Sequence, residues 1–184
     1  MGQQIKLENV QINYPALMQP KTSKNFPNNP PSYGVVAILD PANPLHAQKI
    51  NEIQQSLDSQ NASVFQDRPR GYPSSWKKQP DGKIHVNLNS SQSQPPQCVD
   101  QNVQPVLVDN GTVFYSGAVC NVVIDVYTTT NHGGKLCFGL LMVQKVSDGE
   151  RLDNRPKADE LFAPIPVPGQ PATGPASGQN NPLG

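Results

Sequence analysis

The sequence has 184 residues, of which 20 are proline and 14 are glycine, and this composition excludes an all-helical protein because proline interrupts helix interiors. Fourteen basic and fourteen acidic residues give a net charge of zero, so the chain lacks the strong positive charge that marks the simplest nucleic-acid-binding domains. No run of residues approaches the ~18 apolar residues of a membrane span, and three irregularly spaced cysteines indicate neither a disulfide framework nor a zinc site, so we expect a cytoplasmic protein without a membrane partner.

Residues 5–14 and 33–39 have the patterns of two strands. In the first, apolar and polar residues alternate with one change of parity after Leu7, as in a bulged strand, and Pro15 is expected to end it. The second is a short apolar run that follows prolines, which indicates a buried strand. Between them, residues 20–32 are rich in proline and asparagine and predict a loop.

Residues 43–60 hold the clearest helical pattern. Asn43 can cap the helix, and Pro44 occupies the favoured first position. A single apolar stripe, which predicts that the helix packs on the sheet by one face, is formed by Ile50, Ile53 and Leu57. Residues 61–83 are irregular and predict a long loop, and loops of this length inside a domain are often functional. Residues 84–88 then alternate as a strand.

The strongest strand signal predicts a long hairpin over 113–146 with its turn at 131–134. Its expected buried face contains Ala118, Cys120, Val122, Ile124 and Val126. Because the numbers of paired residues in a hairpin have a nearly constant sum, Cys120 should lie opposite a residue near 145 and should not bond Cys137.

The end of the chain has a different composition. Residues 163–184 contain six prolines, four glycines and no charged residue, and such a segment cannot bury enough apolar surface to fold. We therefore expect a folded domain over residues 1–162 and a disordered tail over 163–184.

The sequence offers little support for an enzyme. The three histidines are far apart and lack metal-ligand spacing: His46, His85 and His132. Three aspartates could hold Mg²⁺ in a nuclease, but two are more simply turn residues and the third a solvent-facing strand residue: Asp100, Asp109 and Asp125, respectively. We expect no catalytic residues, no metal and no cofactor, and a metal-dependent nuclease is an alternative to be tested.

The zero net charge conceals an uneven distribution. Residues 1–83 carry nine basic and six acidic side chains, whereas residues 98–163 carry five basic and eight acidic ones. Basic residues neutralise phosphates, and aromatic rings stack on the bases of single strands. The candidate phosphate-binding residues are Lys21, Lys24, Arg68, Arg70, Lys77, Lys78 and Lys83; the candidate stacking residues are Phe26, Tyr33, Tyr72 and Trp76. The alternative is that Tyr72 and Trp76 fold inward to anchor the loop and that the charges are only solvated.

A set of motifs in the second half carries a resemblance to a known family. These motifs are Tyr115-Ser116-Gly117, Tyr127, the turn 131–134, Gly139-Leu140, the run 143–146, Asp148-Gly149-Glu150, Ala158 and Phe162. With them, most of residues 5–162 resembles a family of phage single-stranded DNA-binding proteins. The resemblance implies a mainly β fold, an OB-like β-barrel with one packed helix and a long central loop. It also implies that Ser116-Gly117 allows a sharply curved strand and that Val143 and Val146 lie in the core.

The resemblance further implies sequence-independent binding and protection of single-stranded DNA in phage replication and recombination. The expected partners are single-stranded DNA and phage or host replication and recombination proteins, and the sequence selects no oligomeric state. The uncharged tail departs from the acidic tails of better-known phage single-strand binders. An alternative function is that of a phage structural or assembly protein that uses a similar barrel for protein contacts.

Overall fold

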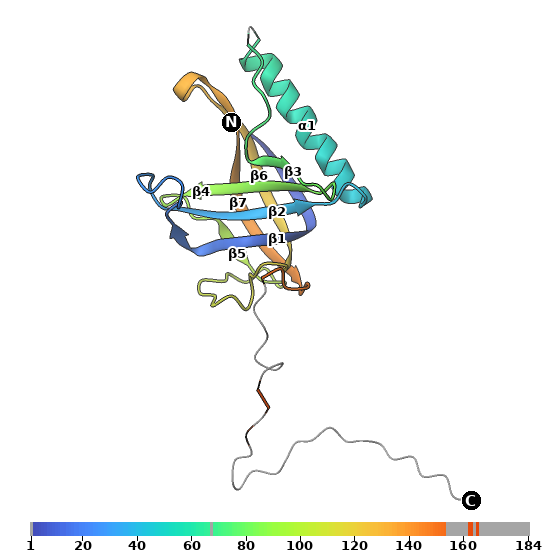
Figure 1. Cartoon of the computed structure of the whole chain (residues 1–184), viewed down its shortest axis with the longest axis vertical. Coiled ribbons are helices and arrows are strands. Elements are labelled where there is room, and N and C mark those ends of the chain that lie inside the picture. The colour runs from blue at the N-terminus through green and yellow to red at the C-terminus, as the bar shows by residue number, and fades with distance from the viewer. Residues whose placement is uncertain (1, 67, 154–161, 164, 166–184) are drawn as a thin grey trace, which may run out of the picture. The chain divides into compact units, whose positions relative to one another are not determined.

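A computed structural model describes residues 2–66, 68–153, 162–163 and 165 of the chain (Figure 1). The chain divides into one unit that ends at Asp153 and a second unit over residues 154–184. The elements of the first unit, in chain order, are β1 (Gln3–Lys21), β2 (Ser32–Leu39), α1 (Pro44–Val64), β3 (Trp76–Lys78), β4 (Ile84–Ser91), β5 (Gln97–Val99), β6 (Val119–Thr129), the short 3-10 helix η1 (Asn131–Gly133) and β7 (Lys135–Ser147). The tail predicted at 163–184 lies outside the described residues, apart from Ala163 and Ile165.

Five strands close into a barrel. The strand order in the sheet is β3-β4-β2-β1-β6-β7-β5, and β4 also pairs in parallel with β7, where Asn89 lies opposite Gly139. The barrel therefore consists of β1, β2, β4, β6 and β7, while β3 pairs with β4 and β5 with β7 outside this ring of five strands (Figure 1). The predicted mainly β, OB-like barrel with one packed helix is confirmed.

The barrel interior follows from the alternation of residues along the strands. In β6 the predicted face is confirmed, because Cys120, Val122, Ile124 and Val126 are all fully buried. Ile84, Val86 and Leu88 of β4 are buried in the same way, and burial of each such side chain contributes about 1.5–3 kcal/mol. The intervening residues of β4 consequently face outward, and this places polar side chains in a row on the barrel surface.

The hairpin of β6 and β7 has the predicted register. Cys120 pairs with Lys145, and Cys137 pairs with Tyr127, so the two thiols lie at different levels of the hairpin. Cys98, Cys120 and Cys137 are all free. Burial raises the pKa of Cys98 and of Cys120 to about 12 each, so both thiols are protonated at neutral pH.

The prediction that Val146 lies in the core is wrong, whereas Val143 is fully buried as expected. A register shift in the hairpin, between the pairs that Leu140 and Met142 form with β6, changes which residues of β7 point inward. Lys145 is therefore buried and Val146 half-buried. The Lys145 ammonium donates to the Val113 carbonyl at 2.9 Å, lies 2.8 Å from the Asp148 carboxylate and sits 4.6 Å from the centre of the Tyr115 ring.

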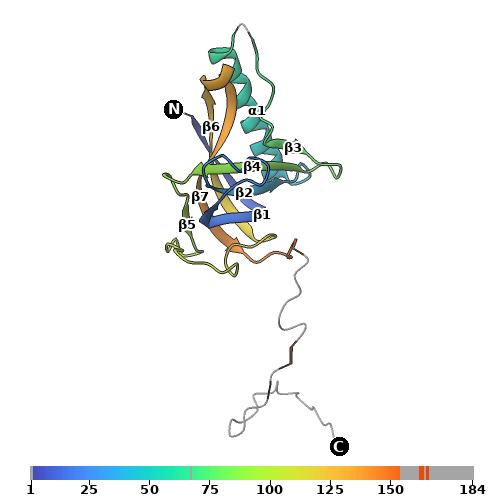
Figure 2. The same ribbon diagram turned by 60° about the vertical axis from the view of Figure 1, so that its left-hand side comes forward.

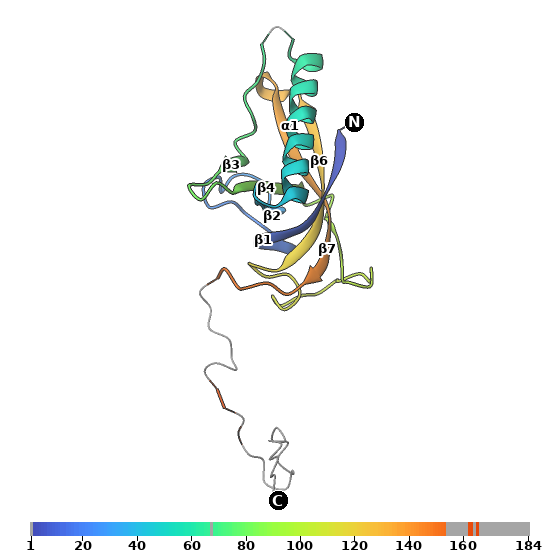
Figure 3. The same ribbon diagram turned by 90° about the vertical axis from the view of Figure 1, so that its right-hand side faces the viewer.

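The helix begins as predicted and ends later. Asn43 caps α1 by accepting a hydrogen bond from the Leu45 N–H at 3.0 Å, but the helix continues to Val64. The Asn61 side chain in its last turn exchanges two hydrogen bonds with the backbone of Arg70, at 2.6 and 2.7 Å, which fixes the chain after the helix. The long loop predicted at 61–83 is thus shorter than expected, and β3 interrupts it. Figures 2 and 3 show α1 alongside the outer part of the β6–β7 hairpin.

The first strand is also longer than predicted. β1 passes through Pro15 and continues to Lys21, with register shifts against β2 on both sides of Ala16. A proline is tolerated at such an irregularity because no ladder hydrogen bond is required of it there. Tyr14, which the alternation placed on the apolar face, is instead 76% exposed.

Candidate nucleic-acid interface

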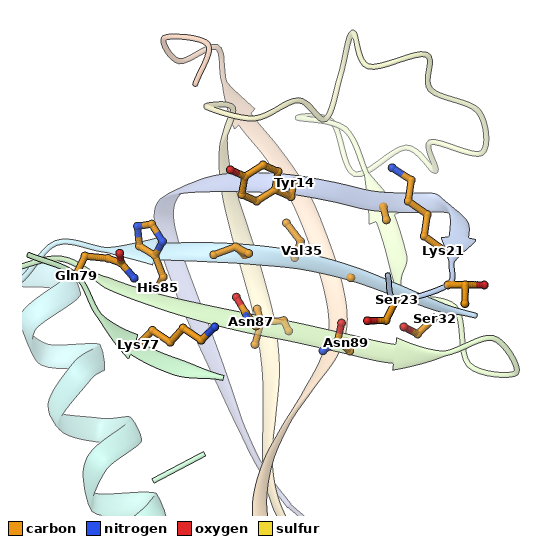
Figure 4. Close-up of a pocket in the computed structure, with 15 residues that line it drawn as sticks. Tyr14, Lys21, Ser23, Ser32, Val35, Lys77, Gln79, His85, Asn87 and Asn89 are labelled. Carbon is orange, nitrogen blue, oxygen red and sulfur yellow. The ribbon is translucent and has the colours of Figure 1, made fainter. Parts of the chain in front are cut away.

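A groove crosses the outer face of β1, β2, β4 and β3, and we call it the strand-face groove (Figure 4). The outward residues of β4 form its floor because they alternate with the buried residues of the barrel. Lys77 of β3 pairs with His85, which continues the same row onto the edge strand. Its polar and aromatic lining consists of Tyr14, Lys21, Thr22, Ser23, Ser32, Lys77, Gln79, His85, Asn87 and Asn89.

The chemistry of this groove suits an anionic, hydrogen-bonding ligand. Lys21 and Lys77 supply positive charge from opposite sides of it, as Figure 4 shows. No carboxylate is among the described residues that line it, so nothing in the lining repels a phosphate. The amides of Asn87 and Asn89 offer both donors and acceptors to phosphate, sugar or base edges.

A second groove lies between the 71–75 segment, the end of β4 and the β6–β7 hairpin, and we call it the hairpin groove. Ser32, Asn87 and Asn89 line both grooves, so the two are continuous. The hairpin groove adds one lysine, two tyrosines and a half-buried thiol: Lys135, Tyr72, Tyr127 and Cys137. Its described lining is again free of carboxylates.

The two tyrosines are neutral at physiological pH. Burial raises the pKa of the Tyr72 phenol, and Asp58 adds to this effect through a hydrogen bond of 3.4 Å. Burial and the neighbouring Cys137 raise the pKa of the Tyr127 phenol. Both rings therefore present uncharged aromatic surfaces to the hairpin groove.

Three of the eleven predicted site residues line these grooves, namely Lys21, Lys77 and Tyr72. Lys24 and Phe26 are exposed in the loop between β1 and β2, whose first residues Thr22 and Ser23 line the strand-face groove. These five residues thus lie at or beside the continuous surface formed by the two grooves.

The other six predicted residues do not line either groove: Tyr33, Arg68, Arg70, Trp76, Lys78 and Lys83. Lys78 and Trp76 alternate with Lys77 in β3 and pair with buried residues of β4. Trp76 packs against the core, with its ring centre 6.1 Å from that of Phe138 and 6.4 Å from that of Tyr72. This supports the alternative in which the tryptophan anchors the loop.

Arg70 is committed to contacts within the protein. Its guanidinium donates to the Gly133 carbonyl at the hairpin turn and lies 5.2 Å from the centre of the Phe65 ring. These contacts join the segment after α1 to the tip of the hairpin.

Sequence reasoning missed most of the residues that line the grooves, among them Tyr14, His85, Asn87, Asn89, Tyr127 and Lys135. The signal for the three β4 residues was present, because they are the polar positions of an alternating strand. Strand alternation could not identify Tyr14 as a groove residue, because an additional irregularity in β1 turns its side chain to the outer face of the sheet.

Two of the three aspartates considered as metal ligands hold turns of the backbone. Asp100 and Asp109 are turn residues, as predicted, and Asp109 accepts hydrogen bonds from the N–H groups of Val113 and Phe114. Burial raises the pKa of Asp109, but the backbone hydrogen bonds lower it more, so the net pKa lies below the usual value. Asp125, predicted to face solvent, is half-buried. Within the described ranges, no cluster of three potential metal ligands exists and no helix is long and apolar enough to cross a membrane.

A family model and several solved structures are similar to this chain. A family model described as the ssDNA-binding protein of Enterobacter phage Enc34 matches residues 3–170. The solved structure of the bacteriophage Enc34 single-stranded DNA-binding protein in complex with ssDNA is similar, with a TM-score of 0.69 and 20% identity over 82% of this chain and 89% of that one. The same phage protein in another structure gives a TM-score of 0.67, with 20% identity over 85% and 88% of the two chains.

A protein of a second phage has the same fold. The single-stranded DNA-binding protein gp2.5 of bacteriophage T7 gives a TM-score of 0.60 and 13% identity over 84% of this chain and 97% of that one. No curated protein sequence matches the chain.

Proposed function

Because the chain belongs to the family of the Enterobacter phage Enc34 ssDNA-binding protein, we propose that it binds single-stranded DNA without reading its sequence. The observation that carries this proposal to particular residues is the continuous surface of the strand-face and hairpin grooves. This surface bears lysines, amides and aromatic rings, and its described lining contains no carboxylate although the whole chain is electrically neutral.

The proposed mechanism divides the work between charge and stacking. Lys21, Lys77 and Lys135 neutralise phosphates along the two grooves, and Lys24 adds charge from the adjacent loop. Tyr72 and Tyr127, with Phe26 in the loop, stack on bases. Duplex DNA hides the faces of its bases, so stacking favours a single strand, and neither kind of contact distinguishes one base from another.

We propose that the protein acts in the host cytoplasm, without enzymatic activity, in phage DNA replication and recombination. Coating a strand removes its hairpins and protects it from nucleases, and it presents the strand to replication or recombination proteins. In this proposal residues 1–162 form the binding domain and residues 163–184 a tail outside it.

Fluorescence anisotropy with labelled oligonucleotides tests the proposal. At low salt the full chain should bind oligo-dT and a mixed-sequence single strand with similar affinity, and a duplex of the same length much more weakly. Equal affinity for single strand and duplex would contradict the mechanism. Incubation of the same oligonucleotides with Mg²⁺ should leave them intact, whereas cleavage would favour the nuclease alternative.

A further inference from the structure

Tyr14 has an unusual backbone for a large aromatic residue. Its φ is +49°, in the left-handed region that glycine and asparagine adopt far more readily. Its side chain is 76% exposed, so the ring returns little burial for this strained conformation. Strained residues of this kind cluster at functional sites, where the surrounding structure enforces them.

The Tyr115-Ser116-Gly117 segment enforces this conformation from 102 residues away. The Tyr14 N–H donates to two oxygens, each at 3.0 Å: the buried Ser116 hydroxyl and the side-chain carbonyl of the neighbouring Asn13. Two residues before Tyr14, the Ile12 carbonyl accepts from the Gly117 N–H at 2.8 Å, and the Ile12 N–H donates to the Ala118 carbonyl at 3.0 Å. Gly117, predicted to lie in a curved strand, precedes β6 with a φ of +108°, which suits its glycine.

These hydrogen bonds set the position of the Tyr14 ring. Figure 4 shows Tyr14 above β1, on the same face of the sheet as Lys21, His85 and Asn87. In the described part of the chain, the Tyr14 hydroxyl has no hydrogen-bond partner and its ring no aromatic partner. Among the described lining residues of the strand-face groove, Tyr14 therefore supplies the one exposed phenol ring, beside the smaller imidazole of His85.

We propose that Tyr14 is a base-stacking residue of the strand-face groove and that Ser116 is its positioning residue. This inference rests on the proposed single-stranded DNA binding, and it assigns a role to a residue that neither charge nor strand alternation identifies. The backbone strain at Tyr14 is the cost of directing the ring into the groove.

Substitution by glycine separates binding from stability, because it removes the ring and also relieves the left-handed strain. We expect Tyr14→Gly to weaken oligo-dT binding about 5- to 150-fold, which corresponds to ~1–3 kcal/mol for one stacked base. Its melting temperature should be equal to or above that of the unmodified protein. Tyr14→Trp should retain binding.

Val103 provides a matched control. It also has a left-handed backbone, with a φ of +61°, it is 64% exposed, and it lines neither groove. Val103→Gly should raise the melting temperature and leave the dissociation constant unchanged. If Tyr14→Gly also binds like the unmodified protein, the stacking role is refuted while the proposed function stands; if the unmodified protein does not bind single strands, the proposed function itself fails.

The role of Ser116 needs a readout that a general loss of stability would not change. Oligonucleotides that contain 5-iodouracil crosslink to aromatic side chains on which they stack, and mass spectrometry identifies the residue. Ser116→Ala should reduce the crosslink at Tyr14 relative to that at Tyr127, and Ser116→Thr should restore it. An unchanged ratio of the two crosslinks in Ser116→Ala would overturn the positioning role.

Discussion

Lys77 and Lys78 offer a sharp test of the strand-face groove because they differ mainly in the face of the sheet to which their side chains point. Both are exposed, both carry one positive charge, and they are neighbours in the three-residue edge strand β3. Lys77 lies beside His85 in the groove, whereas Lys78 pairs with the buried Ile84 and lines neither groove. The proposed mechanism therefore predicts that Lys77→Gln weakens DNA binding and that Lys78→Gln does not.

The size of the effect follows from counterion release. Each phosphate contact with a single strand contributes about 0.7 to the slope of log K against log salt, so loss of one contact weakens binding about eightfold at ~0.05 M salt and about threefold at ~0.2 M. Long-range attraction changes equally in both variants, since the two charges are adjacent. The difference between the variants thus isolates the direct contact.

The assay is anisotropy with labelled oligo-dT at several salt concentrations, combined with thermal melts of all three proteins. Lys77→Gln should show a slope about 0.7 shallower than the unmodified protein, and the melting temperatures should agree. Equal slopes and affinities for Lys77→Gln and Lys78→Gln would refute the placement of the DNA backbone across this face.

Three further predictions concern the stability and reactivity of the fold. Asp109→Ala should destabilise the protein by ~2 kcal/mol and lower its melting temperature by about 4–8 °C. Because the pKa of Asp109 in the folded protein lies below the usual value, its contribution to stability is present at neutral pH and is lost in acid. The difference in unfolding free energy between the unmodified protein and Asp109→Ala, measured by denaturant melts, should therefore shrink below about pH 4. Native Cys98 and Cys120 should not react with a thiol reagent at about pH 8, while Cys137 reacts slowly, and rapid labelling of all three would contradict their burial. Gly117→Ala should cost ~3 kcal/mol in chemical denaturation, because its φ is positive and a Cβ would collide with the Glu150 carbonyl; a neutral substitution would show that this turn relaxes freely.

The strands and the hairpin register could be predicted because alternation and turn chemistry are local. The sum rule for the hairpin placed Cys120 opposite Lys145 correctly, even though a register shift lies between this pair and the turn. That same shift made the inward direction of Val146 unpredictable, since one irregularity exchanges the two faces of a strand. The Asn43 cap was equally local, whereas the end of α1 depends on the contact of Asn61 with Arg70.

The candidate site was less predictable because the charge and aromatic content of a segment do not show in which direction each side chain points. Lys77 and Lys78 are equivalent in composition, and β3 separates them only after the strand pairs with β4. Trp76 fits an exposed stacking residue by type, yet its ring packs against that of Phe138, 62 residues further along the chain. The outward position of Tyr14 could not be predicted without the hydrogen bond between its N–H and Ser116, which only the tertiary structure reveals.

The short edges of the sheet have a consequence for the behaviour of the protein at high concentration. Among the described strands, the two that end the sheet, β3 and β5, have three residues each. An exposed edge is a template for unwanted pairing between molecules; the shortness of both edges opposes it, and Lys77 and Lys78 add charge to β3. A foreign strand could form only a few hydrogen bonds with β3 or with β5, so these two edges should not join neighbouring copies crowded on one nucleic acid strand into a continuous sheet.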